Sequence, residues 1–72
     1  MTYYIINLKD DRVLCVHRDF ERYYIRSMWG IGGRITLFQT TDFDKAKAVL
    51  DNVKTHWKGS WAIVNTRGDV VG

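Results

Sequence analysis

Apolar side chains recur at helical spacing between Thr41 and Trp57, and this pattern is the clearest structural signal in the chain. Successive steps of three, four, three and four residues place five of them on one face of a helix: Phe43, Ala46, Leu50, Val53 and Trp57. Charged and polar side chains occupy most of the opposite side. The pattern therefore predicts one amphipathic helix over residues 41–57.

The ends of this helix carry residues that favour starting and stopping it. The hydroxyl of Thr41 is placed to cap the amino end, and Asp44 lies three residues later, as in a capping box. Lys54 and His56 suit the negative end of the helix dipole. Gly59 favours termination, because glycine readily adopts the backbone conformation that ends a helix.

Short runs rich in aromatic and β-branched side chains, bounded by polar or glycine-containing turns, predict strands in the rest of the chain. The expected strands are Tyr3–Leu8, Val13–His17, Tyr23–Trp29, Arg34–Thr40, Trp61–Asn65 and a short Val70–Val71. Short turns join them, which favours antiparallel pairing. The order β-β-β-β-α-β-β predicts an α+β fold with an antiparallel sheet of about five or six strands packed on a single helix. Several strands are apolar on both faces, so the pattern leaves open which face the helix covers.

Length and composition limit the class of protein. Seventy-two residues make one domain, residues 1–72, and a hydrophobic content of 46% excludes a disordered chain. A domain of this size buries only about 60% of the surface that its unfolded chain exposes, so a second subunit would add stability. Strands that are apolar on both faces favour the same outcome, and we expect a homodimer.

Charge and hydropathy exclude some locations and partners. The net charge of +3 arises from eleven basic and eight acidic side chains that are interspersed along the chain. This balance is mildly basic and does not by itself indicate nucleic-acid binding. Cys15 is the only cysteine, and no apolar run approaches the roughly 18 residues that span a membrane. We therefore expect a cytoplasmic protein without a membrane segment.

Few side chains could carry catalysis. Cys15 and two distant histidines do not make a metal-ligand set, and no intrachain disulfide is possible. Cys15, His17, His56 and Ser60 show no spacing that would order a nucleophile and its base. We therefore expect neither an enzyme nor a protein that holds a metal or a cofactor.

The stretch MWGIGGR, residues 28–34, places apolar side chains in a glycine-rich turn. Exposed hairpin tips are usually polar, so this apolar tip needs an explanation. In one interpretation Met28, Trp29 and Ile31 insert into a partner protein, because tryptophan is enriched at interface hot spots. In a second, the tip folds back and closes the end of the core. In a third, the glycine backbone and Arg34 hold an anion.

Aromatic and arginine side chains also occur together in the expected strands. Tyr24 and Arg26 share one face of the third strand, and Arg34 opens the fourth. Proteins that hold single-stranded nucleic acid stack bases on such rings and meet phosphates with guanidinium groups. The competing interpretation is that a small domain needs its aromatic residues for the core and leaves its arginines solvated. Nucleic-acid binding through these three residues is the alternative function.

The last expected strand is a second candidate contact, because an unprotected sheet edge invites pairing with another chain. Our first hypothesis is a small non-enzymatic binding module that acts by protein–protein contact. Its contact residues would be Met28, Trp29, Ile31, Val70 and Val71.

The segments YYIINL and DFDKAKAVL give most of the chain a general likeness to known proteins. In this pattern it resembles the small α+β proteins that bacteriophages and prophages encode, among them anti-CRISPR inhibitors with a sheet packed on one helix. The resemblance implies an accessory or inhibitory role exerted by binding a protein. It assigns no functional residue.

Overall fold

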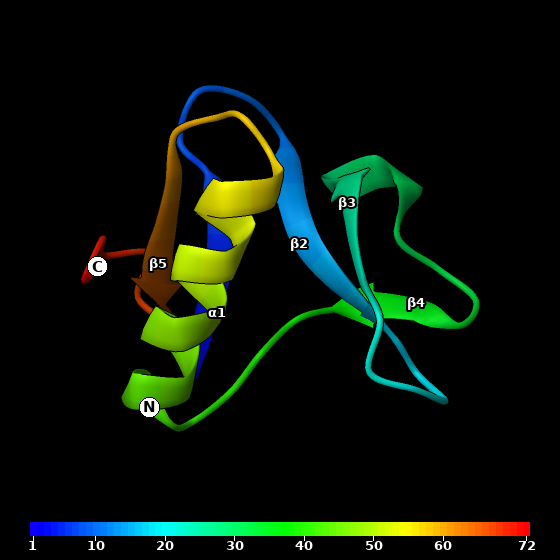
Figure 1. Cartoon of the computed structure of the whole chain (residues 1–72), viewed down its shortest axis with the longest axis horizontal. Helices are drawn as coiled ribbons and strands as arrows, with labels where there is room; N and C mark the ends of the chain where they lie inside the picture. The colour runs from blue at the N-terminus through cyan, green and yellow to red at the C-terminus, as the bar shows by residue number, and fades with distance from the viewer.

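The computed structural model describes residues 1–72, which form an antiparallel sheet with one helix on one of its faces (Figure 1). The elements are β1 (Tyr3–Asn7), β2 (Arg12–His17), β3 (Tyr23–Ser27), the 3-10 turn η1 (Met28–Gly30), β4 (Ile35–Leu37), α1 (Phe43–His56) and β5 (Trp61–Asn65). The α+β class and the five-stranded antiparallel sheet on a single helix are confirmed. The expected sixth strand does not form, because Val70 makes only one bridge, to Val64.

The sheet is built around β2, which pairs with three other strands. The main order is β3-β2-β1-β5, and β4 pairs with β2 outside this path. One edge of β2 faces β3, with Leu14 opposite Ile25. The other edge faces β1 only at Val13 and then faces β4, where Cys15 lies opposite Leu37. Strands β1 and β4 therefore share one edge of β2, and the sheet divides where β1 leaves it.

The helix packs on β1 and β5, and not on the half of the sheet that contains β3 and β4 (Figure 1). Ile5 on β1 lies opposite Ile63 on β5, and both side chains face α1. The buried core consists of Ile5, Leu14, Phe38, Ala46, Val49, Leu50, Val53, Trp61 and Ile63. The helix therefore covers the face that carries the odd-numbered residues of β1 and β5, which the sequence had left open.

The helical stripe differs in detail from the predicted one. Val49 is buried although the predicted stripe omits it, since the side chains at positions 46, 49, 50 and 53 together form the inward surface of the helix. Phe43 and Trp57, at the two ends of the predicted stripe, are only half-buried. The buried stripe is thus wider in the middle of the helix, and its end residues are less buried, than a regular three-four spacing suggests.

The opposite face of the sheet is also well packed, although no helix covers it. Val13 and Cys15 on β2 are buried there. Their cross-strand neighbours include Ile6 and Arg26 beside Val13, and Tyr24 beside Cys15. Because cross-strand neighbours lie only about 5 Å apart at their Cβ atoms, the longer side chains shield the shorter ones from solvent.

The prediction that Thr41 caps the helix is wrong by one residue. The helix begins at Phe43, and the carboxylate of Asp42 accepts hydrogen bonds from the N–H groups of Asp44 at 3.0 Å and Lys45 at 3.2 Å. At the other end, the N–H of Trp57 donates to the carbonyl of Val53 at 2.8 Å. A carboxylate cap satisfies two free N–H groups and also complements the positive end of the helix dipole.

Two of the predicted strands end two or three residues earlier than expected, and the first ends one residue early, at Asn7. The third stops at Ser27, because the Ser27 hydroxyl accepts from the N–H of Trp29 at 3.3 Å and the chain turns into η1. The fourth stops at Leu37. Beyond it the chain diverges from β2, and Thr40 exchanges backbone hydrogen bonds of 2.8 and 3.1 Å with Tyr3 of β1.

Gly59 lies where the chain passes between α1 and β5 and comes very close to two buried side chains. Its φ of +150° is unfavourable for residues with a Cβ. A Cβ at this position would lie 2.9 Å from Nε1 of Trp61 and closer still to Nδ2 of Asn7. Both nitrogens are buried and have no hydrogen-bond partner. The Oδ1 of Asn7 accepts from the N–H of Lys9 at 2.9 Å, so the Asn7 side chain would lose this bond if it moved away.

We expect Gly59→Ala to lower the free energy of unfolding by about 2 to 3 kcal/mol, since it adds backbone strain and a clash with buried side chains. Urea unfolding followed by circular dichroism measures this change. Gly32→Ala is the matched control, because a Cβ there meets nothing within 4 Å. Equal stabilities of the two variants would contradict the packing described for Gly59.

Asp42→Ala should lower the free energy of unfolding by about 1 kcal/mol, because two helix N–H groups lose their acceptor. Thr41→Ala should leave it within about 0.5 kcal/mol, the usual range for a surface change. The same unfolding measurement compares the two variants. A larger loss for Thr41→Ala would restore Thr41 as the cap.

Candidate functional site

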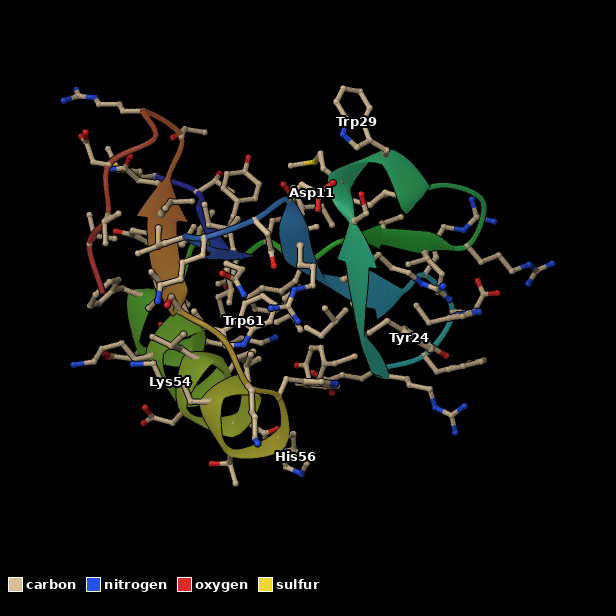
Figure 2. The ribbon with its side chains drawn as sticks, turned by 90° about the horizontal axis from the view of Figure 1, so that it is seen from above. Asp11, Tyr24, Trp29, Lys54, His56 and Trp61 are labelled. Atoms are coloured by element: carbon tan, nitrogen blue, oxygen red, sulfur yellow. The ribbon has the colours of Figure 1, made fainter.

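The η1 turn holds Trp29 in solvent. Trp29 is 89% exposed and Met28 is 47% exposed, whereas Ile31 is half-buried. Figure 2 shows Trp29 projecting on the side of the molecule that lies away from α1. The interpretation in which this tryptophan folds back into the core is therefore wrong, and only Ile31 turns partly inward.

Hydrogen bonds to the β1–β2 turn fix the position of η1. The Ser27 hydroxyl donates to the carboxylate of Asp11 at 2.6 Å, and the N–H of Met28 donates to the Asp11 carbonyl at 2.9 Å. The same hydroxyl oxygen accepts from the N–H of Trp29. Asp11 thus holds η1 through both its side chain and its backbone. The backbone that carries the exposed Trp29 indole is therefore fixed in position.

A pocket of about 290 Å³, which we call the Trp29 pocket, lies beside this turn. Ile6 and Val13, which face each other across β1 and β2, line it together with Met28 and Trp29. Asn7, Asp10, Asp11 and Arg12 complete the lining. Its volume lies just below the roughly 300–1,000 Å³ that is usual for small-molecule sites, so it suits one apolar side chain better than a cofactor.

The two carboxylates of the pocket have different partners. Asp10 forms an ion pair with Arg12, whose Nε lies at 2.8 Å. The hydrogen bond from the backbone N–H of Arg12 is the main reason that the pKa of the Asp10 carboxyl is lowered. Asp11 has the Ser27 hydroxyl as a donor but no basic side chain within ion-pair distance. The pocket therefore keeps one carboxylate free to meet a cation.

Val70 and Val71, the other predicted contact residues, lie elsewhere. The N–H of Val71 donates to the Ile63 carbonyl at 2.9 Å, and the N–H of Ile63 donates to the Gly72 carbonyl at 3.1 Å. Residues 69–72 therefore run along the outer edge of β5, at the opposite end of the sheet from β3 and η1. The structure brings Met28, Trp29 and, more loosely, Ile31 together, but not the two valines.

Of the three residues of the nucleic-acid alternative, only Tyr24 and Arg26 are in contact with each other. The guanidinium of Arg26 lies over its own neighbour Tyr24, with Cζ 5.7 Å from the ring centre. Arg34 forms an ion pair with Asp19 and is not a free cation. That pairing also weakens the interpretation of the glycine turn as an anion site, because the one arginine that would complete it is neutralised.

The candidate catalytic side chains Cys15, His17 and His56 do not lie together, and the fourth, Ser60, bonds to Leu8 only through its backbone carbonyl. Cys15 is completely buried, and burial raises the pKa of its thiol. The ring of His17 stacks on Phe20 at 4.0 Å, and its Nδ1 accepts from the N–H of Asp19. The ring of His56 contacts the Asn52 carbonyl at 2.9 Å on the exposed side of α1. Within the structure, no group of three or more His, Cys, Asp or Glu side chains is placed to hold a metal ion.

No family model, curated protein or solved structure matches this chain. The structure also contains no helix with the length and apolar character needed to cross a membrane. Sequence reasoning found Met28 and Trp29 but missed Ile6, Val13 and Asp11. The hairpin signal around Lys9–Arg12 indicates that the first two strands pair, but not the register that places Ile6 opposite Val13.

Alkaline pH should destabilise the folded chain. Burial raises the pKa of the Cys15 thiol above its ordinary 9.0, and burial with the nearby Glu21 charge raises the pKa of the Tyr23 hydroxyl above its ordinary 10.0. Because the unfolded chain gives up these protons first, stability is fully present below pH 9 and falls above it. Urea unfolding at pH 7 and pH 10 measures the loss.

The matched control for this prediction is a Cys15→Ala, Tyr23→Phe double variant, which lacks both protons. Its stability should fall less between pH 7 and pH 10 than that of the original chain. An equal fall in both proteins would show that other groups cause the alkaline loss.

Proposed function

We propose that this protein is a small non-enzymatic binding module that captures a partner protein at the Trp29 pocket. The observation that carries the proposal is an indole that is 89% exposed beside an apolar pocket. A tryptophan side chain is among the largest apolar groups, and leaving one in water forgoes the stabilisation that its burial would contribute. Tryptophan is also the residue type most enriched at interface hot spots.

The hydrogen bonds that hold η1 in place support this proposal. The bonds from Ser27 and Met28 to Asp11 order the turn before any partner arrives. Binding then loses less conformational freedom than it would with a mobile loop, so more of the contact energy appears as affinity. The same bonds place the Asp11 carboxylate at the rim of the pocket that Trp29 borders.

The lining of the pocket suggests the chemistry of the partner. Ile6 and Val13 suit an apolar side chain, and Met28 adapts its shape to different occupants. The free carboxylate of Asp11 suits a lysine or arginine next to that side chain. We therefore propose a partner segment that combines one large apolar residue with an adjacent basic residue. An accessory or inhibitory role, as the resemblance to small phage and prophage proteins implies, would follow from occupying such a segment.

Single-stranded nucleic acid is the weaker proposal. Tyr24 and Arg26 lie on the sheet face that α1 does not cover, but Arg26 already lies over Tyr24 and Arg34 is paired with Asp19. A binder of phosphates would lose affinity steeply as salt rises, because bound phosphates release counterions. The salt dependence of affinity therefore distinguishes nucleic-acid binding from binding of a protein partner at the Trp29 pocket.

A displayed random-peptide library, selected on the immobilised protein, tests the proposed function. We expect enrichment of peptides in which a large apolar residue adjoins Lys or Arg. Trp29→Ala should then raise the Kd of a selected peptide at least about 30-fold, the effect of losing a hot spot of about 2 kcal/mol. Isothermal titration calorimetry measures the affinity.

Val70→Ala is the matched control, because it removes an exposed apolar side chain at the other end of the sheet. It should leave the Kd unchanged, whereas Asp11→Asn should weaken binding mainly at low salt. Selected peptides that bind the Trp29→Ala variant as well as the original would exclude the pocket. Salt-dependent binding of an oligothymidylate that Arg26→Ala abolishes would favour the nucleic-acid alternative.

A further inference from the structure

The two outer edges of the sheet are unlike each other. At one end, residues 69–72 hydrogen-bond along β5 and cover its outer edge. At the other end, β3 is the last strand and pairs only with β2 (Figure 1). A free edge strand offers unpaired N–H and C=O groups to another chain. The edge of β3 is therefore the place where this sheet can be extended.

The hydrogen bonds at the two ends of β3 show which of its backbone groups are free. The carbonyl of Arg22 accepts from His17 at 3.0 Å, and the N–H of Met28 donates to Asp11 at 2.9 Å. Because the direction of these groups alternates along an antiparallel strand, the even-numbered residues bond to β2. The N–H and C=O groups of Tyr23, Ile25 and Ser27 consequently point outward.

We propose that β3 pairs in antiparallel fashion with β3 of a second copy, around a two-fold axis at Ile25. Ile25 would then lie opposite Ile25 of the second copy, and Tyr23 opposite Ser27 on either side. In each of these pairs, the two opposing residues would donate to and accept from each other through their backbone N–H and C=O groups. The result would be one continuous sheet through two molecules, with the helices at its far ends.

In this register the side chains of the two β3 strands complement each other. Tyr24 of each copy would face Arg26 of the other, and a guanidinium attracts the face of an aromatic ring. These two side chains already make that contact within one chain, at 5.7 Å. Arg26 is the one charged side chain of β3, so no like charges would oppose each other. This self-complementarity favours a second copy over an unrelated strand.

The strand also lacks the usual protection of an edge. Natural edge strands carry lysine or proline, contain bulges, or lie under a helix or loop. β3 contains neither residue, and α1 packs on β1 and β5 instead. Tyr23 and Ile25 are only half-buried at the border of the core. Pairing would cover them with the same residues of the second copy. The Trp29 pocket plays no part in this inference.

Light scattering after size-exclusion chromatography of the full chain, from about 10 µM to 1 mM, tests the proposal. We expect the mass to rise from 8.5 kDa toward twice that value with concentration. Tyr24→Lys should raise the dimer Kd about tenfold, because it places two like-charge pairs opposite each other. Tyr24→Glu, which loses the same ring, should dimerise at least as well as the original chain, because its carboxylate faces Arg26.

Amide hydrogen exchange provides a second measurement that does not depend on a variant. The N–H groups of Tyr23, Ile25 and Ser27 should exchange more slowly at 1 mM than at 10 µM, while those of β2 should not change. A mass of 8.5 kDa at all concentrations would overturn the proposal. So would a dimer that Tyr24→Lys and Tyr24→Glu weaken equally, or one whose β3 amide protons exchange at a rate independent of concentration.

Discussion

Backbone pairing along both edges of β2 determines how this chain is arranged. β3 occupies one edge, while β1 and β4 take successive parts of the other. A single helix of 14 residues cannot cover both halves of the sheet that results. It packs where β1 and β5 place large apolar side chains, such as Ile5 and Ile63, on one face. The free edge therefore lies in the uncovered half, and the exposed indole lies on the side of the molecule away from the helix.

The parts of the fold that follow from short-range pattern were predicted correctly. The helix carries a regular apolar period and the strands β1, β2 and β5 are short apolar runs, and each forms within one or two residues of its expected bounds. One error arises where residues distant in the chain determine the structure. The third strand stops at Ser27 because its hydroxyl meets Asp11, sixteen residues earlier in the chain. The capping error has a local cause, since Thr41 and Asp42 are both suitable caps and the backbone selects the second.

The candidate site was predictable only in its exposed part. An apolar tip in a glycine-rich turn singled out Met28 and Trp29, because composition alone makes such a tip unusual. The pocket needs the register that places Ile6 opposite Val13, and the sequence pattern does not determine that register. Val70 and Val71 were expected to form a free edge. They instead bond back to β5, an interaction that the composition of the last residues does not indicate.

The three tryptophans of this chain occupy three different environments. Trp29 is exposed, Trp57 is half-buried at the end of α1, and Trp61 is buried with the Arg12 guanidinium 5.5 Å from its ring centre. Their emission spectra and their sensitivity to a dissolved quencher such as iodide should therefore separate. The red-shifted, easily quenched component belongs to Trp29. The protein thus carries its own optical reporter of contact at η1, and Trp61 reports independently on whether the core remains intact.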